Sequence, residues 1–216
     1  MSIRVDLRDP AARRQGLESA ASAVRRGALV VLPTDTVYGV AADAFSQPGI
    51  ERLLAAKGRG RDFPLPVLVG TPQTVDGLTF GLPGSARRLV EAFWPGGLTL
   101  VVRHAPSLAW DLGDAGGKVA LRMPLHPAAL ELLRVTGPLA VTSANRTGLP
   151  VPQTCDEAES QLDEQVAVYL DGGPAAEGPP STIVDASAEA PVLLREGSVA
   201  VADLLEVCPD LVLPGA

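Results

Sequence analysis

A short apolar run that opens directly into a polar loop constrains the fold of this chain more than any other feature. Residues 28–32 read Ala-Leu-Val-Val-Leu and lie between Gly27 and Pro33. A continuous apolar run of this length is typical of a central strand that is covered on both faces. Because Pro33 has no N–H group to donate to a neighbouring strand, we expect the strand to end there. The run therefore predicts an α/β fold, in which helices flank a sheet.

Polar side chains follow this strand, and similar residues stand at the ends of several others. Ligands bind at the carboxyl ends of strands in open α/β sheets, so hydroxyl groups placed there can orient a polar substrate. Such residues are also ordinary turn formers, but their recurrence at several strand ends favours a cleft lined with hydrogen-bond donors. The polar residues at these ends are Thr34, Thr36, Arg122, Ser143, Asn145, Ser181, Thr182 and Arg195.

The segment before residue 58 is predicted to be a helix that ends in two cations. One face of it carries Ile50, Leu53, Leu54 and Lys57. A lysine on an apolar face must reach water or pair with an anion, because an unpaired buried ammonium is costly. Gly58 and Gly60 end the helix and leave the backbone around Arg59 bare. This turn suits a polyanion such as a nucleotide phosphate, and a solvated helix end favoured by the helix dipole is an equally good interpretation.

The rest of the 216 residues alternates strands with helices and contains no linker that would separate two cores. We therefore predict one domain with a mixed sheet over residues 1–207, followed by a short, frayed tail over residues 208–216. The other strands are expected at residues 3–5, 65–69, 98–102, 119–121, 139–141, 166–170, 181–185 and 192–195. The other helices are expected at residues 17–26, 86–93 and 126–136, with two more after residues 154 and 198.

Several local expectations concern proline and the helix caps. Pro66 lies inside the strand at residues 65–69, so we expect that strand at an edge or with a bulge. Ser85 and Ser198 are expected to cap the helices that follow them. Thr154 and Glu157 match a capping box. Residues 105–117 are expected to form an irregular loop.

Composition excludes several classes of protein. Hydrophobic residues make up 46% of the chain, which is enough for a substantial core and excludes wholesale disorder. The net charge of −7 means that the surface as a whole repels nucleic acid, so a polyanion site must be local. Cys155 and Cys208 show no metal or redox spacing, and His104 and His126 alone make a poor metal set. No signal peptide or run of about 20 apolar residues is present, so we expect a cytoplasmic protein without a membrane segment.

The usual motifs of covalent and nucleotide chemistry are missing. The sequence has no P-loop, no dinucleotide fingerprint, no Gly-x-Ser-x-Gly elbow and no cysteine with a plausible histidine base. Asp35 and Asp43 could form a carboxylate pair, although turn stabilisation is the favoured interpretation of both. This inventory favours a reaction that is driven by positioning and charge neutralisation.

Six motifs, taken together, resemble the L-threonylcarbamoyladenylate synthase family, the YrdC-like domain. Each motif is weak alone, but their order and gaps between Gly27 and Gly197 make the resemblance specific. The motifs are Pro33-Thr34-Asp35-Thr36-Val37-Tyr38-Gly39; Ala56-Lys57-Gly58-Arg59; Phe93-Trp94-Pro95-Gly96 with Leu98-Thr99-Leu100; Val119-Ala120-Leu121-Arg122-Met123-Pro124; Thr142-Ser143-Ala144-Asn145 with Gly148; and Ser181-Thr182-Ile183-Val184-Asp185 with Leu194-Arg195-Glu196-Gly197.

The resemblance implies a nucleotidyltransferase that joins L-threonine, bicarbonate and ATP into threonylcarbamoyl-adenylate and pyrophosphate for tRNA modification. It implies a YrdC-like fold, a twisted open sheet with a concave basic groove. Mg²⁺ would accompany ATP, with no metal site in the protein itself. The implied partners are downstream tRNA threonylcarbamoyl-transferase proteins, with weak RNA binding in the groove. The chain resembles the short form of the family, which lacks an appended carboxyl-terminal domain.

The resemblance also implies roles for individual residues, with Lys57 and Arg59 as the catalytic pair. For ATP it implies Lys57, Arg59, Ser143, Asn145 and Arg195. For L-threonine it implies Thr34, Thr36, Arg122, Ser143 and Ser181. The sequence departs from the family where Gly60 replaces the usual proline, Phe63 an asparagine and Leu68 a histidine. No ligand contact is carried over to Phe63 or Leu68.

Two alternative functions remain open. A carbamoyl-transfer domain of the hydrogenase-maturation type shares this domain, and a missing requirement for threonine would identify it. That domain normally belongs to a longer chain with acylphosphatase-like and zinc-finger parts. A double-stranded-RNA or ribosome-binding module is the second alternative. The net charge of −7 argues against it, and salt-sensitive RNA binding without ATP turnover would support it.

Overall fold

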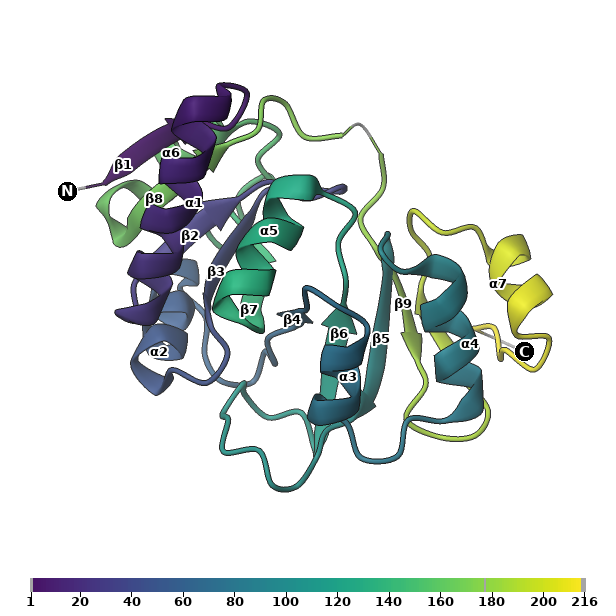
Figure 1. The fold of residues 1–216 in the computed structure, drawn as a ribbon. Helices are drawn as coiled ribbons and strands as arrows, with labels where there is room; N and C mark the ends of the chain where they lie inside the picture. The colour runs from purple at the N-terminus through teal and green to yellow at the C-terminus, as the bar shows by residue number, and fades with distance from the viewer. Residues whose placement is uncertain (1, 177, 215–216) are drawn as a thin grey trace.

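Ten strands form one mixed sheet with helices on both faces in the computed structural model, which describes residues 2–176 and 178–214 (Figure 1). The strands are β1 Ile3–Asp6, β2 Leu29–Leu32, β3 Gly39–Asp43, β4 Val67–Leu68, β5 Leu98–Arg103, β6 Lys118–Arg122, β7 Leu139–Ser143, β8 Val166–Asp171, β9 Thr182–Asp185 and β10 Val192–Arg195. The helices are α1 Pro10–Arg25, α2 Gln47–Lys57, α3 Gln73–Leu78, α4 Gly84–Phe93, α5 Pro127–Thr136, α6 Cys155–Leu162 and α7 Val201–Val207, with a 3₁₀ turn at Asp163–Gln165.

The sheet combines parallel and antiparallel pairs, which confirms the predicted mixed sheet. Its strand order is β1-β8-β2-β3-β7-β4-β6-β5-β9-β10. The pairs β1–β8, β2–β8, β4–β6 and β5–β9 are parallel, and the other neighbours are antiparallel. The last two strands form the predicted adjacent pair, with Leu193 opposite Val184.

The core lies on both faces of the sheet because the side chains of each strand alternate between the faces. In β2, Leu29 and Val31 join one apolar cluster, while Val30 and Leu32 join the other. Helices α1 and α5 pack on the second cluster, and the first contains residues of α2, α4, α6 and α7. All four residues of β2 are buried, which confirms the prediction of a central strand.

One element differs from the sequence-based expectation, and two were not predicted at all. β4 lies between β7 and β6 and pairs with both without a register shift, so the prediction of an edge strand or a bulge is wrong. The strand begins after Pro66, whose missing N–H is therefore not needed, and the Pro66 carbonyl accepts from the Val141 N–H at 2.9 Å. β3 and α3 had no predicted counterpart. The sequence of β3, Gly-Val-Ala-Ala-Asp, is poor in strand-forming residues.

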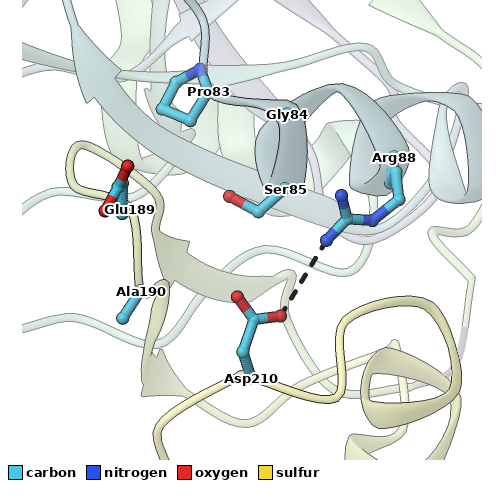
Figure 2. A pocket seen from close by; sticks show the side chains of 7 residues that line it. All are labelled: Pro83, Gly84, Ser85, Arg88, Glu189, Ala190 and Asp210. Carbon is cyan, nitrogen blue, oxygen red and sulfur yellow. Dashed lines mark ion pairs between the residues drawn. The ribbon is translucent and has the colours of Figure 1, made fainter.

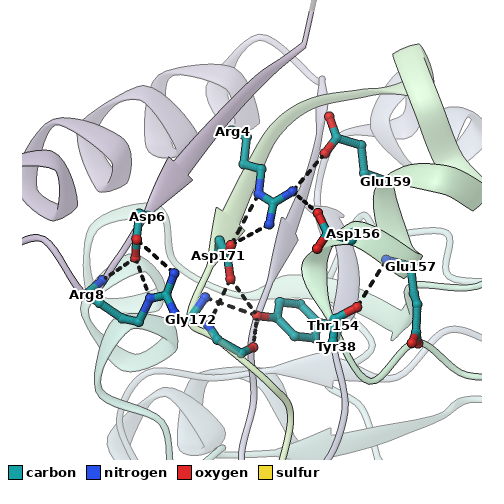
Figure 3. Close-up of polar contacts among 11 residues, drawn as sticks. Arg4, Asp6, Arg8, Tyr38, Thr154, Asp156, Glu157, Glu159, Asp171 and Gly172 are labelled. Atoms are coloured by element: carbon teal, nitrogen blue, oxygen red, sulfur yellow. Dashed lines mark hydrogen bonds and ion pairs between the residues drawn. The ribbon is translucent and has the colours of Figure 1, made fainter.

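The helix caps follow the predictions only in part. Ser85 lies inside α4, where its buried hydroxyl has no partner among the described residues, so its predicted role as a cap is wrong. Ser198 is not a cap either, because its hydroxyl donates to the Gly97 carbonyl at 3.2 Å. The hydroxyl of Thr154 does accept from the Glu157 N–H at 3.2 Å and caps α6 (Figure 3).

The chain after α7 packs against the sheet, so the prediction of a frayed end is wrong for its described part. Cys208 and Leu211 are buried in the apolar core. Val212 accepts a hydrogen bond from the Leu193 N–H at 2.9 Å and donates one to the Pro191 carbonyl at 2.8 Å. Across residues 2–176 and 178–214, no helix combines the length and the apolar character that are needed to cross a bilayer.

Candidate functional site

Lys57 meets the Ser143–Asn145 turn, 86 residues further along the chain, as the sequence predicted. The side chain comes from the last turn of α2, which Gly58 ends in a left-handed conformation. Its ammonium donates to the Ser143 carbonyl at 2.5 Å, to the Asn145 side-chain oxygen at 3.0 Å and to the Asn145 carbonyl. An ammonium has three protons, so these acceptors use all of them. Lys57 therefore fixes the turn that follows β7.

The amide of Asn145 is also fully engaged. Its Oδ1 accepts from the Ser143 hydroxyl at 2.5 Å as well as from Lys57. Its Nδ2 donates to the carbonyls of Arg146 at 3.1 Å and Leu149 at 2.8 Å. The side-chain donors of Lys57, Ser143 and Asn145 thus all have partners, which holds the turn in one conformation.

Arg59 is the cation of this region with unused donors. Its Nε donates to the Thr147 hydroxyl at 2.9 Å, and its guanidinium lies 5.2 Å from the centre of the Phe63 ring. Its two terminal nitrogens have no hydrogen-bond partner among the described residues. Burial lowers the pKa of Lys57 to about 8, and the charge of Arg59 lowers it in the same direction. We call Lys57, Arg59, Ser143 and Asn145 the lysine cluster.

Arg122 and Thr36 meet at a second place. The guanidinium of Arg122 donates to the Thr36 hydroxyl and to Asp35 Oδ1, each at 2.8 Å, and to the Gly96 carbonyl at 3.0 Å. Asp35 also accepts from the Leu125 N–H at 2.9 Å. An arginine side chain has five N–H donors, and partners among the described residues use three of those of Arg122. One N–H remains on each terminal nitrogen, which matches the two oxygens of a carboxylate.

The hydroxyl of Thr34 faces inward and shapes the loop that carries Thr36. It donates to the Val37 carbonyl at 2.6 Å and accepts from the N–H groups of Thr36 and Val37, each at 3.2 Å. Thr34 is 7% exposed and Thr36 is 5% exposed. In this conformation the Thr34 hydroxyl closes the turn, and the Thr36 hydroxyl accepts a hydrogen bond from Arg122.

Ser181 and Arg195 bind each other beside this group. Arg195 donates to the Ser181 carbonyl at 2.7 and 3.1 Å and to its hydroxyl at 3.1 Å. Thr99 donates to the same hydroxyl at 2.9 Å. Burial lowers the pKa of Arg195, and the charge of Arg122 lowers it further, so the two guanidinium groups are within electrostatic range. We call Thr36, Arg122, Ser181 and Arg195 the arginine cluster.

The loop at residues 33–38 joins the two clusters. Thr36 belongs to the arginine cluster, and two residues later the carbonyl of Tyr38 accepts from the Ala144 N–H at 2.8 Å, between Ser143 and Asn145. Within the arginine cluster, the turn after α4 connects Arg122 to the Ser181 segment, because the Gly96 carbonyl accepts from Arg122 and the Gly97 carbonyl accepts from the Thr182 N–H at 2.9 Å. All nine predicted site residues thus lie in these two clusters or in the loop between them.

Neither cluster contains the ligand set of a protein-bound metal. In residues 2–176 and 178–214, no three His, Cys, Asp or Glu side chains are grouped so that they could hold an ion. A cavity of about 460 Å³ lies elsewhere, between the start of α4 and the segments that carry Glu189 and Asp210 (Figure 2). It contains none of the predicted site residues. Arg88 reaches Asp210 across it at 3.9 Å.

Sequence reasoning missed Asp35 and Gly96 as partners of Arg122, and Tyr38 as the residue next to the turn after β7. Asp35 was interpreted only as a turn former or as half of a carboxylate pair. A usable signal was present, because a buried arginine requires an acid and the motif around Thr36 contains one. Gly96 could not be found from its type, since it contributes only its carbonyl.

The chain is similar to several known proteins. The family model for Sua5, YciO and YrdC, described as telomere recombination, matches residues 22–197. A protein of Mycobacterium tuberculosis is 54% identical over 207 residues, which are 96% of this chain and 95% of that protein. The threonylcarbamoyl-AMP synthase of Bacillus subtilis is 38% identical over 185 residues, which are 85% of this chain and 54% of the synthase.

Among solved structures, Pyrococcus abyssi Sua5 complexed with L-threonine superposes with a TM-score of 0.89 and 32% sequence identity. The superposition covers 99% of this chain and 62% of the Sua5 chain. The chain thus spans between half and two thirds of the length of the Bacillus and Pyrococcus proteins and nearly all of the mycobacterial one.

Proposed function

Because the chain belongs to the Sua5/YciO/YrdC family, we propose that it is a threonylcarbamoyl-AMP synthase, which forms threonylcarbamoyl-AMP and pyrophosphate from L-threonine, bicarbonate and ATP. Its homologues are named for this activity, and a related structure holds L-threonine. Both findings favour this function over a carbamoyl-transfer domain and over an RNA-binding module. The product is an adenylate, which makes the enzyme a nucleotidyltransferase in tRNA modification.

The observation that carries the proposal is the pair of unused N–H groups on Arg122 beside the Thr36 hydroxyl. In the proposed complex, the two N–H groups bind the carboxylate of L-threonine. Thr36 and Ser181, which lie at the two ends of the arginine cluster, supply hydroxyls for the rest of the amino acid. Arg122 is only 7% exposed, so a bound carboxylate is partly shielded from water and held more strongly.

ATP is proposed to lie along the lysine cluster, with Arg59 as the direct phosphate contact. A guanidinium about 4 Å from a phosphate oxygen contributes on the order of 4 kcal/mol at an effective dielectric near 20, before desolvation is subtracted. Lys57 holds Ser143 and Asn145 in place and adds its charge to the site. Arg195 lies within reach of a nucleotide that runs between the clusters. Mg²⁺ enters as part of the substrate, on the phosphates of ATP.

The proposed reaction has two steps. The amine of threonine adds to the carbon of CO₂, which is in equilibrium with bicarbonate, and loses a proton to give a carbamate. A carbamate oxygen then attacks the α-phosphorus of ATP, and the bond to the β-phosphate oxygen breaks as pyrophosphate leaves. The side chains of both clusters orient the reactants and neutralise charge, and none of them forms a covalent bond.

The proposal extends to the setting of the enzyme. The product would pass to tRNA threonylcarbamoyl-transferase proteins, which attach its threonylcarbamoyl group to tRNA. We therefore propose a cytoplasmic location for the enzyme. The predicted basic groove and its weak RNA binding belong to the same proposal. Filter binding of tRNA at rising salt would test that part separately.

Pyrophosphate release tests the reaction itself. We expect release that requires ATP, L-threonine and bicarbonate together, and that falls to background when any one of them is omitted. Release that continues without threonine would instead support carbamoyl-adenylate chemistry. The matched control is L-serine in place of L-threonine, because it keeps the carboxylate and the amine but lacks the methyl group.

Replacing Arg59 by alanine is expected to raise the KM for ATP about 10- to 100-fold while the protein stays folded. The variant loses charge-assisted hydrogen bonds to phosphate, which contribute roughly 1.5–3 kcal/mol, and each 1.4 kcal/mol is about tenfold. In the part of the chain that the structure describes, the Arg59 side chain makes one hydrogen bond, so little stability depends on it. Arg61→Ala is the control on the same turn, since Arg61 pairs with Asp111. An unchanged KM for ATP in Arg59→Ala would contradict the assignment.

A further inference from the structure

Tyr38 closes the loop that carries Thr36, and its side chain is fully buried. The phenol points to the carboxyl end of β8 (Figure 3). Its hydroxyl donates to the Gly173 carbonyl and accepts from the Gly172 N–H at 3.0 Å, with Asp171 Oδ1 at 3.4 Å. Burial raises the pKa of Tyr38, so the hydroxyl keeps the proton that it donates. A side chain of this loop is therefore bonded to a strand that contributes nothing to either cluster.

The first residue of the loop rests on the same strand end. A side chain added at Gly172 would place its Cβ 2.8 Å from Pro33 Cγ and 3.1 Å from Pro33 Cβ. Such distances are too short for ordinary contact, so the Pro33 ring lies directly on the bare backbone of Gly172. Pro33 and Tyr38 are the two ends of the loop. Both contact Gly172, Pro33 through its ring and Tyr38 through a hydrogen bond from the Gly172 N–H.

Asp171 holds the end of β8 in place through hydrogen bonds to Gly173 and Arg4. Its Oδ1 accepts from the Gly173 N–H at 2.9 Å, and its Oδ2 accepts from Arg4 at 2.6 and 3.2 Å (Figure 3). Burial acts to raise the pKa of Asp171, but the bonds from Arg4 and Gly173 outweigh it, so the pKa is lowered and the carboxylate stays charged. Arg4 belongs to β1, which pairs with β8 along this stretch.

We propose that Asp171, Gly172 and Gly173, the β8 platform, hold the loop at residues 33–38 in the conformation that places Thr36 on Arg122. Tyr38 and Gly172 are then positioning residues for L-threonine, although neither touches the substrate. The inference rests on the proposed function. It adds the end of β8 to the site. The sequence analysis did not predict this segment, because Gly172 and Gly173 lie outside all six sequence motifs.

The test compares two fully buried tyrosines whose hydroxyls bind different parts of the chain. Tyr169 is also fully buried, and its hydroxyl donates to the Asp163 carbonyl at 2.7 Å, away from the loop. We expect Tyr38→Phe to raise the KM for L-threonine about tenfold with the KM for ATP unchanged. Tyr169→Phe should lose similar stability in a thermal melt but keep both KM values.

A second pair of variants tests the steric contact between Gly172 and Pro33 instead of the hydrogen bonds of Tyr38. Gly172→Ala places a methyl group against Pro33 and is expected to raise the KM for L-threonine as well. Gly77→Ala in α3 is its control, because no atom of the described residues outside the helix's own backbone and the neighbouring residues lies within 4 Å of the added Cβ. Neither glycine has a positive φ, so alanine brings no backbone strain at either position. If Tyr38→Phe does not fold, this pair still tests whether the β8 platform positions the loop.

Hydrogen exchange supplies a readout that does not depend on activity. The N–H groups of Thr36 and Val37 are bonded to Thr34, and we expect their exchange to become faster in Tyr38→Phe and Gly172→Ala than in the controls. Equal threonine KM and equal exchange in each variant and its control would overturn the platform. A wild-type protein without threonine-dependent pyrophosphate release would overturn the proposed function, and faster exchange in Tyr38→Phe would still support the platform.

Discussion

Replacing Lys57 by methionine is expected to lower kcat/KM for pyrophosphate release about 100-fold. Methionine keeps most of the apolar side chain but removes the donor of three hydrogen bonds, so three oxygens of Ser143 and Asn145 are left without it. Leaving buried partners of a charged group unpaired costs about 3 kcal/mol, and each 1.4 kcal/mol is about tenfold. The turn after β7 would relax and lose the geometry that ATP requires. The same variant should melt at a lower temperature.

The pH dependence gives a second check on Lys57. Its pKa is lowered to about 8, so the wild-type rate should fall as pH rises through that value and the ammonium loses the proton for one of its acceptors. Lys57→Met should lack this alkaline decline. Lys118→Met is the control, because Lys118 is 39% exposed in its side chain and pairs with Asp185 at 2.8 Å. Near-normal turnover in Lys57→Met would show that the turn holds without the ammonium.

Replacing Arg122 by lysine is expected to raise the KM for L-threonine at least about 100-fold. The guanidinium binds Gly96, Thr36 and Asp35 and still has two donors for a carboxylate, whereas an ammonium has only three protons in total. Lysine therefore cannot keep these partners and bind the substrate as well. A lost bidentate pair of charged hydrogen bonds costs roughly 3 kcal/mol, which is about 100-fold.

The measurement is the dependence of pyrophosphate release on threonine and ATP concentration. The KM for ATP should change little, since the lysine cluster does not contain Arg122. Arg103→Lys is the control, because the Arg103 side chain is exposed and, among the described residues, donates only to the Ser187 carbonyl at 3.3 Å. A normal KM for threonine in Arg122→Lys would place the carboxylate elsewhere.

Much of the fold could be predicted because local pattern and tertiary role agree in most elements. The apolar run of β2 is covered on both faces, and α2 ends at Gly58 as its sequence indicates. β3 escaped prediction since its small residues have little strand preference, and pairing with β2 and β7 makes it a strand. Ser85 and Ser198 were misassigned because another residue begins each helix, a difference that a capping preference cannot resolve.

The candidate site could be predicted as a set of residues but not as a set of contacts. The family resemblance placed Lys57 and Asn145 at one ATP site, yet it did not show that protein oxygens take all three protons of the ammonium. Tyr38 was part of a motif, but its partners Gly172 and Gly173 contribute only backbone groups. Every residue has a carbonyl and nearly every residue an N–H, so residue type does not predict which backbone groups will bind a side chain. The folded structure is needed to identify them.

The pairing of β1 with β8 has a consequence for biosynthesis. Arg4 and Asp171 are 167 residues apart, so during synthesis β1 must wait for a partner strand that is made much later. Contacts of such large sequence separation make folding slow, because a long loop must close before they form. A nascent chain that stops before β8 would lack both the neighbour of β1 and the support beneath Pro33, and it should be more exposed to proteases and aggregation than the folded chain.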